Sequence, residues 1–417
     1  MAIVKPFRGV RFNLEKVLLK QVIAPPYDVI SPDEREVLVG RSSYNIVNID
    51  LPEGEEKYQK AAQLYQTWRS EEILQKDTEP AIYLYEQEYE YGGRNYVRSG
   101  FVGLLRLEKL GEGVVFPHEK TLSGPKEDRL ALMVACKANL SQIFGLYLDQ
   151  DDVMKSIFME CRQTMPVESA VDDNKVKHTV WMINDPETIR QIQAFMKDKA
   201  VYIADGHHRY ETSLTYRDKM REKNNDIEFE AQPYDYVMMM FVNFYDSGLM
   251  IFPTHRVLDF MEGVSEETVF EGLKAHYAIT KLADKAESDA FLTAHKDPGT
   301  MVMVLKSGRY GLLLDPEHLE SLHPVYREID TYLLQTNIIN SVLRIPDEQL
   351  LAKKGIHFYQ SEADVEKQVQ KHGGAGFILK PTTIEAMRKV SESGLVMPQK
   401  STFFYPKLAT GLILNEL

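Results

Sequence analysis

A run of ionisable side chains at a glycine turn is the strongest candidate for chemistry in this sequence. The run Asp205-Gly206-His207-His208-Arg209 follows an apolar segment and opens a stretch with helical spacing. The first turn of a helix leaves backbone N–H groups without partners, and the helix dipole favours negative charge there. His and Arg side chains also donate to phosphate and carboxylate oxygens. The pattern predicts an anion-binding turn; a solvated helix start capped by Asp205 is the alternative.

A second group of ionisable side chains precedes a helix that we expect from about Asp128 to Ala138. Pro117 and the pair Gly124-Pro125 restrict the backbone on either side, which favours a loop held in place over a freely solvated one. Glu119 is the candidate general base in this loop, since a hydroxyl nucleophile needs one at neutral pH. The candidates for substrate binding are His118, Lys120, Lys126 and Arg129.

The same turn could instead take part in a metal site. His207 and Glu211 lie four positions apart, so they share one face of the expected helix. Together with His118 or His255 they would supply three ligands to a transition metal. This pattern offers a metal-dependent phosphohydrolase as an alternative. For Mg²⁺, which prefers carboxylate oxygens, Asp205 is the nearest ligand.

The composition of the chain limits the classes of protein to which it can belong. The chain has 417 residues, with 49 Lys and Arg against 62 Asp and Glu, a net charge of −13. This charge opposes binding to nucleic-acid phosphates, so nucleic acid is not an expected partner. The two cysteines, Cys136 and Cys161, form no C-x-x-C pair,. The most apolar run, Tyr236 to Tyr245, is about half the length that spans a bilayer. We therefore expect a cytoplasmic protein without a membrane segment.

The pattern of apolar residues predicts an α/β fold with mixed sheets. Two β-rich runs around Gly92-Gly93 predict a hairpin, and strands alternate with helices through residues 142–223. The continuous apolar run 236–243 predicts a strand buried on both faces. The prolines of 23–30 predict an extended loop. A second α/β pattern follows, so we expect a site-bearing region over residues 1–260 and a C-terminal α/β region over 261–417.

Five short motifs carry a resemblance to known proteins. The chain resembles a bacterial and archaeal family known only as a domain of unknown function, through Pro25-Pro26-Tyr27-Asp28-Val29, Pro117-His118-Glu119-Lys120-Thr121, Asp205-Gly206-His207-His208-Arg209, Pro253-Thr254-His255-Arg256-Val257 and Phe403-Phe404-Tyr405-Pro406-Lys407. The Asp-Gly-His-His-Arg turn also resembles the phosphate-binding turn of the ParB/sulfiredoxin-like superfamily, most closely in its free serine kinase branch. That resemblance implies a ParB/sulfiredoxin-like core that binds ATP or ADP with Mg²⁺.

The residues and the resemblance together predict a small-molecule kinase. The expected reaction is nucleotide-dependent phosphoryl transfer to a small hydroxylated metabolite, with free serine as the first substrate to test. Glu119, Asp205 and His208 are the candidate catalytic residues, Asp205 the candidate metal ligand. The expected phosphate-binding residues are Gly206, His207, His208 and Arg209. A ParB-like, nucleotide-gated binding protein without turnover is the alternative. The substrate and the oligomeric state stay open.

Overall fold

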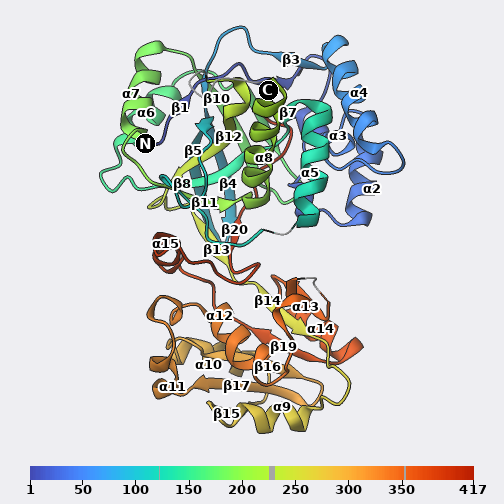
Figure 1. The fold of residues 1–417 in the computed structure, drawn as a ribbon, viewed down its shortest axis with the longest axis vertical. Helices are drawn as coiled ribbons and strands as arrows, with labels where there is room; N and C mark the ends of the chain where they lie inside the picture. The colour runs from blue at the N-terminus through green and yellow to red at the C-terminus, as the bar shows by residue number, and fades with distance from the viewer. Residues whose placement is uncertain (122, 225–230, 352–353) are drawn as a thin grey trace. The chain divides into compact units, whose positions relative to one another are not determined.

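The chain divides into two compact units, which are described separately (Figure 1). The computed structural model describes residues 1–121, 123–224, 231–351 and 354–417. Unit 1 comprises residues 1–117, 121–250 and 406–417, and unit 2 comprises residues 118–120 and 251–405. The last twelve or so positions of the chain thus pack with the N-terminal part of the sequence.

Unit 1 is built on a nine-stranded sheet in the order β6-β11-β8-β12-β5-β4-β10-β9, with β1 pairing onto β5. Its strands are β1 (Val4–Lys5), β4 (Ile82–Tyr91), β5 (Arg94–Arg106), β6 (Val115–Phe116), β8 (Ile143–Tyr147), β9 (Glu168–Val171), β10 (Lys177–Ile183), β11 (Val201–Asp205) and β12 (Tyr236–Asn243). The pairs β11·β6 and β12·β8 are parallel, whereas β11·β8 and β12·β5 are antiparallel. The predicted α/β class with mixed sheets is therefore confirmed.

Two sequence patterns account for the centre of this sheet. Gly92 and Gly93 have φ values of +59° and +74°, which a two-residue hairpin turn requires and glycine adopts without steric cost,. They join β4 to β5 as predicted. Every residue of β12 is buried between β8 and β5, so the continuous apolar run does form a strand covered on both faces,.

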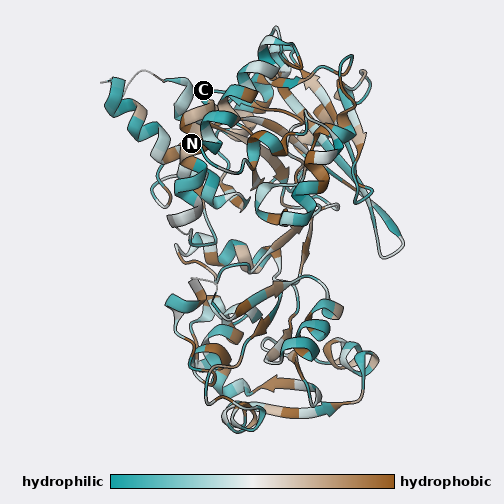
Figure 2. Ribbon diagram, turned by 90° about the vertical axis from the view of Figure 1, so that its right-hand side faces the viewer, coloured by the Kyte–Doolittle hydropathy of each residue, from teal (hydrophilic) through white to brown (hydrophobic). Residues whose placement is uncertain are grey.

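Unit 1 also contains α-helices, some of which pack against this sheet. They are α1 (Leu19–Val22), α2 (Pro32–Arg41), α3 (Val47–Asp50), α4 (Lys57–Ser70), α5 (Ser123–Cys136), α6 (Val153–Cys161), α7 (Pro186–Met196) and α8 (His207–Asn224). Figure 1 shows α8 and α5 side by side, and Figure 2 shows apolar strands between largely polar helices. Short strands β2 (Val10–Phe12), β3 (Leu74–Lys76), β7 (Ala138–Asn139) and β21 (Asn415–Glu416) pair at the periphery, and η2 (Pro233–Asp235) precedes β12.

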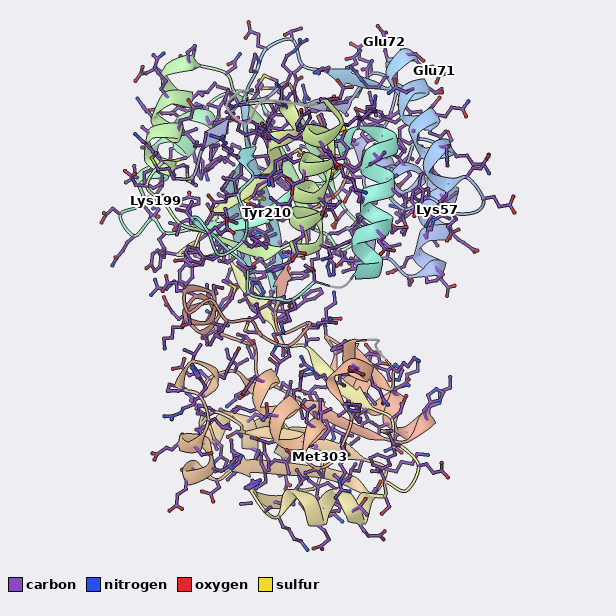
Figure 3. All side chains as sticks on the ribbon, viewed as in Figure 1. Lys57, Glu71, Glu72, Lys199, Tyr210 and Met303 are labelled. Carbon is purple, nitrogen blue, oxygen red and sulfur yellow. The ribbon has the colours of Figure 1, made fainter. Side chains whose placement is uncertain are left out.

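Unit 2 has a six-stranded sheet of its own, in the order β15-β17-β16-β19-β14-β18. These strands are β14 (His255–Leu258), β15 (Tyr277–Leu282), β16 (Met301–Leu305), β17 (Gly308–Leu314), β18 (Ile356–Tyr359) and β19 (Ala375–Ile378). Met303, labelled in Figure 3, lies fully buried at the centre of this sheet. A separate two-stranded sheet pairs β13 (Met250–Phe252) with β20 (Phe403–Tyr405).

Unit 2 also contains helical segments, some of which pack against its sheet. They are α9 (Glu266–Leu273), α10 (Lys285–Ala294), α11 (Pro316–Ser321), η3 (Pro324–Tyr326), α12 (Asp330–Leu334), the π-helical turn η4 (Gln335–Asn340), α13 (Asp347–Leu351), α14 (Glu362–His372) and α15 (Ile384–Glu392). In α14, Val365 and Val369 are fully buried and share the apolar cluster of Val304 and Ile378. The four-residue spacing of the two valines places both on the sheet-facing side of the helix.

Two local predictions were wrong: the start of one helix and the conformation of one loop. Helix α5 begins at Ser123 instead of about Asp128. Pro125 falls in its first turn, where a missing N–H removes no intrahelical bond, so the proline starts the helix instead of preceding it. The expected extended loop at 23–30 contains the 3-10 turn η1 (Tyr27–Val29). The turn closes through Val29 N–H to the Pro26 carbonyl at 3.1 Å, which requires no N–H from either proline.

Within the described residues, no helix combines the length and the apolar character needed to cross a membrane.

Candidate functional site

The predicted anion-binding turn joins β11 to α8. Gly206 has a φ of +94°, a conformation that other residues rarely adopt,. A Cβ on this residue would lie 3.0–3.2 Å from the guanidinium group of Arg209. The side chain of Arg209 therefore folds back over the turn, and the glycine leaves the space for it. The first intrahelical bond runs from Tyr210 N–H to the Gly206 carbonyl at 3.0 Å.

Contacts of two residues, Tyr210 and Asp205, fix this turn in unit 1. The hydroxyl of Tyr210, labelled in Figure 3, donates to the Glu108 carbonyl at 2.9 Å and accepts from the Glu108 N–H at 3.1 Å. Oδ1 of Asp205 accepts from the N–H of Gly206 at 2.8 Å, and its Oδ2 forms an ion pair with Nζ of Lys407 at 3.1 Å. Of the other turn residues, His207 is buried and His208 is half-buried. A lysine from the end of the chain thus stands beside the predicted turn.

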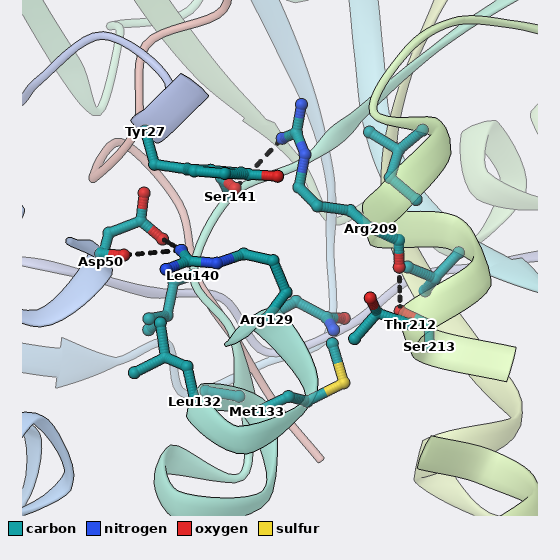
Figure 4. A pocket seen from close by; sticks show the side chains of 14 residues that line it. Tyr27, Asp50, Arg129, Leu132, Met133, Leu140, Ser141, Arg209, Thr212 and Ser213 are labelled. Carbon is teal, nitrogen blue, oxygen red and sulfur yellow. Dashed lines mark hydrogen bonds and ion pairs between the residues drawn. The ribbon is translucent and has the colours of Figure 1, made fainter. Parts of the chain in front are cut away.

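Arg209 points into a pocket of unit 1 that Arg129 also lines (Figure 4). Nη1 of Arg209 donates to Oγ of Ser141 at 3.0 Å and to the Gln142 carbonyl at 2.6 Å. The pocket encloses about 430 Å³ of space, part of it open to solvent. We call it the guanidinium pocket; the polar side chains that line it are Tyr27, Asp50, Arg129, Asn139, Ser141, Arg209, Thr212 and Ser213.

Charge in the guanidinium pocket is dominated by its two arginines. Nη1 of Arg129 donates to the carbonyl of Asp50 at 2.6 Å and approaches its Oδ1 at 3.3 Å. The Arg129 guanidinium also lies 4.1 Å from the ring centroid of Tyr27. Burial raises the pKa of Asp50, while the charges of Arg129 and Arg209 act to lower it. One buried carboxylate therefore faces two guanidinium groups, an arrangement suited to an added anion.

Arg129 is also held by its neighbour in the sequence. Its Nη2 donates to Oδ2 of Asp128 at 2.6 Å, and Oδ1 of Asp128 accepts from Nζ of Lys57 at 2.7 Å. Burial acts to raise the pKa of Asp128, but the Lys57 hydrogen bond and the Arg129 charge outweigh it and lower the pKa to about 2. Hydrogen bonds to Asp50 and to Asp128 thus hold the Arg129 guanidinium in place.

Lys126 contacts helix α8 at Glu211, one turn after the first residue of the helix. Its Nζ donates to Oε2 of Glu211 at 2.8 Å, and Thr121 Oγ1 donates to the same oxygen at 2.7 Å. These bonds tie α5 and the segment before it to α8. The Glu211 carboxylate, a candidate metal ligand by sequence, is engaged by them. Over residues 1–121, 123–224, 231–351 and 354–417, no group of three or more His, Cys, Asp or Glu side chains could hold a metal ion.

The other predicted site residues belong to unit 2. His118 is fully buried, with Nε2 at 2.9 Å from Oγ1 of Thr402. Oε1 of Glu119 accepts from the N–H of Ser401 at 3.3 Å and lies 4.0 Å from Nε2 of His118. Glu119 forms a parallel bridge with Met397. Their roles in substrate binding and catalysis stay predictions.

His255, the other metal ligand that the sequence offered, has a structural contact in unit 2. Its Nδ1 accepts from the N–H of Leu379 at 3.2 Å, which requires an unprotonated Nδ1,. Burial and the adjacent charge of Arg256 lower the pKa of His255 to about 4. The histidine is therefore neutral in the folded protein near neutral pH.

This neutral histidine predicts a loss of stability in acid. Its pKa falls from 6.5 to about 4 on folding, so the unfolded chain binds an extra proton between these values. The free energy of unfolding should drop through this window by about 3 kcal/mol because of His255 alone. His255→Gln keeps an acceptor for Leu379 but does not titrate. Urea unfolding at several pH values should show a shallower slope for this variant; equal slopes would contradict the assignment.

Sequence reasoning missed three parts of this site. Asp50, Ser141 and Lys407 contact predicted residues, yet none was a candidate. Lys407 and Tyr27 do lie in two of the five motifs that carried the family resemblance, which was the available signal. No pattern in the neighbouring sequence marks Asp50 or Ser141 as a site residue, because the topology of the fold brings them to Arg129 and Arg209.

The fold and the site together define an α/β protein with a cationic pocket beside the N-terminus of a helix. Residues 4–332 match the family described as a protein of unknown function (DUF1015), and the chain belongs to this family. The expected family membership is thereby confirmed. None of the curated proteins matches the chain.

Solved structures give distant likenesses. A conserved hypothetical protein from Pyrococcus furiosus is 14% identical with a TM-score of 0.35, covering 71% of this chain and 89% of that one. A mutant free serine kinase in complex with ADP is 12% identical with a TM-score of 0.35, covering 70% and 84%. C-terminally truncated SbnI from Staphylococcus aureus is 10% identical with a TM-score of 0.36, covering 74% and 85%. These scores are too low to carry an argument about activity.

Proposed function

We propose that unit 1 binds the phosphates of a nucleotide and that the protein transfers a phosphoryl group to a small hydroxylated metabolite. The observation that carries this proposal is the convergence of Arg209 and Arg129 on one pocket at the start of α8. Guanidinium groups bind phosphate oxygens through paired, charge-assisted hydrogen bonds. Free serine is the first acceptor to test, because the Asp-Gly-His-His-Arg turn resembles that of the free serine kinases.

The polar groups of the pocket fit an anionic ligand. Oγ1 of Thr212 is buried, and among the described residues it has no hydrogen-bond partner. Nη1 of Arg209 donates to Ser141 and Gln142; within the part of the chain that the structure describes, no hydrogen bond engages its Nε or Nη2, so these nitrogens are available to a ligand,. Lys407 adds a further positive charge at Asp205. A phosphate group would supply acceptors to all three side chains.

The proposed reaction forms a bond between the acceptor oxygen and the terminal phosphorus of ATP or ADP. The bond from that phosphorus to its bridging oxygen breaks, the shorter nucleotide leaves, and a carboxylate takes the hydroxyl proton. Arg129 and Arg209 would stabilise the charge that spreads over the transferred group. Glu119, Asp205 and His208 are the proposed catalytic residues.

Magnesium fits the proposed site less well than phosphate does. When bound, Mg²⁺ neutralises charge on nucleotide phosphates. Asp205 was the expected ligand, but its Oδ1 accepts from Gly206 and its Oδ2 pairs with Lys407. A cation at Asp205 would have to displace the lysine ammonium. We therefore propose that arginine and lysine side chains of unit 1 carry most of the charge neutralisation.

Arg209→Ala should weaken binding of ATP and ADP by about 1.5–3 kcal/mol, the scale of hydrogen bonds to charged groups. Arg209→Lys keeps the charge but loses the planar pair of donors, so it should recover only part of the affinity. Lys219→Ala, an exposed change on the same helix, is the control. Calorimetry on variants with unchanged melting temperature measures the effect. Equal affinity of Arg209→Ala and the wild type would reject this site.

An acceptor screen tests the reaction. The protein is incubated with ATP or ADP and an amino-acid mixture, and phosphorylated products are sought by phosphorus NMR and mass spectrometry. Phosphoserine formation would support the proposal with serine as acceptor. Tight nucleotide binding without any product would favour a nucleotide-gated binding protein. Absence of nucleotide binding would reject both.

A further inference from the structure

Unit 2 contains a pocket that shares no lining residue with the guanidinium pocket of unit 1. It encloses about 780 Å³ of space, part of it open to solvent. Its walls are largely apolar, and Leu350, Ile356, Phe358 and Met397 are among the residues that line it. All of its lining residues belong to unit 2.

A buried arginine forms part of this pocket. Arg256 is 2% exposed and donates through Nη1 to the carbonyl of Thr254 at 2.9 Å. Its Nη2 donates to the carbonyls of Gln399 at 3.1 Å and Lys400 at 3.4 Å. Its guanidinium lies 5.5 Å from the ring centroid of Phe358. These acceptors are neutral, so they hold the guanidinium in place without cancelling its charge.

The charge of Arg256 is costly in this position. Burial lowers the pKa of Arg256 to about 10, although the charge of Glu119 acts in the opposite direction. Lys120 also lines the pocket and adds a second positive charge at an exposed position. Since a buried cation is stabilised by an opposite charge, an anion in the pocket would relieve part of this cost.

A buried amide donor points to the same kind of ligand. Nε2 of Gln399 is buried, and no acceptor among the described residues bonds to it. A buried donor without a partner is unfavourable and rare. Gln399 precedes Lys400, whose φ of +55° is uncommon for a residue other than glycine,. The segment is thus held by Arg256 in a strained conformation of the kind found at binding sites.

We propose that the unit 2 pocket binds a small organic carboxylate with an apolar body. The carboxylate would accept hydrogen bonds from Gln399 Nε2 and face the charges of Arg256 and Lys120. The apolar body would pack against Phe358, Leu350 and Ile356. This combination of one polar end and apolar walls matches the composition of small-molecule sites. The inference does not depend on the proposed nucleotide site in unit 1.

The test compares an acid with its neutral amide. Titration of the full-length protein with para-fluorophenylacetate and para-fluorophenylacetamide, followed by fluorine NMR, measures both affinities. We expect the acid to bind about tenfold more tightly, the effect of one charge-assisted interaction. Lys120→Met should weaken binding of the acid more than binding of the amide, whereas Gln399→Leu should weaken binding of both probes. Lys281→Met, an exposed change in unit 2, is the control and should alter neither affinity.

Two further variants locate the site. Val396→Trp places a large ring at a half-buried position of the pocket wall and should abolish binding of both probes. Arg209→Ala, in unit 1, should leave binding of both probes unchanged and so separates this site from the nucleotide site. Equal affinity for acid and amide, or full binding by Val396→Trp, would overturn the proposal, as would the absence of any shift with either probe.

Discussion

Substitution of Arg129 by alanine is expected to lower the free energy of unfolding by about 3–5 kcal/mol, because it leaves a buried carboxylate without its counter-charge. Arg129 is 6% exposed and Asp50 is 5% exposed. Without Arg129, burial would act on Asp50 with only Arg209 left to oppose it. The substitution also removes the contact with the Tyr27 ring. Urea unfolding measures the change.

The control for this prediction is Arg190→Ala. Arg190 pairs with Glu187 on helix α7, but the two side chains are 66% and 61% exposed. Exposed pairs contribute about 0–1 kcal/mol, so this variant should unfold almost like the wild type. If Arg129→Ala lowered the free energy of unfolding as little as Arg190→Ala does, Arg129 would not contribute to the stability of the fold. Its assignment as a ligand-binding residue of the guanidinium pocket would then become the stronger account.

The strands and helices that carry the site could be predicted because their signals are local. The Gly92-Gly93 hairpin depends on two adjacent residues with positive φ. Strand β12 is one continuous apolar run. Helix α8 follows Gly206, which has no Cβ to collide with the Arg209 guanidinium. Each signal lies within a few residues of the element that it predicts. The start of α5 was misplaced because a proline in a first turn and a proline before a helix look alike in sequence,.

The partners of the site residues could not be predicted in the same way. The ion pair of Asp205 with Lys407 joins β11 to the last residues of unit 1, and Arg129 meets Asp50 from another helix. Such pairs depend on which segments the sheet brings together. The spacing of His207 and Glu211 likewise gave no sign that Lys126 and Thr121 both donate to the Glu211 carboxylate.

Glu119→Gln is expected to lower kcat by about 10²–10⁴, the usual loss when a general base is removed. A serine hydroxyl is a poor nucleophile at neutral pH, so the proposed transfer requires a carboxylate to accept its proton. Two acidic residues compete for this role. Proton transfer to Asp205 would break its ion pair with Lys407 and disturb the turn at Gly206. Glu119 accepts from the N–H of Ser401, and its Oε1 lies 4.0 Å from Nε2 of His118.

The substitution is conservative in shape. Glutamine keeps Oε1, so the hydrogen bond from Ser401 N–H at 3.3 Å can persist. Nucleotide affinity should therefore stay within about threefold, well under the 1.4 kcal/mol of a tenfold change. Glu328→Gln, which removes an exposed carboxylate paired with Lys389, is the matched control in unit 2. If Glu119→Gln turns over normally and Asp205→Asn does not, Asp205 is the base. If neither variant loses activity, a carboxylate base at these positions is rejected; if no acceptor is phosphorylated at all, the kinase proposal itself fails.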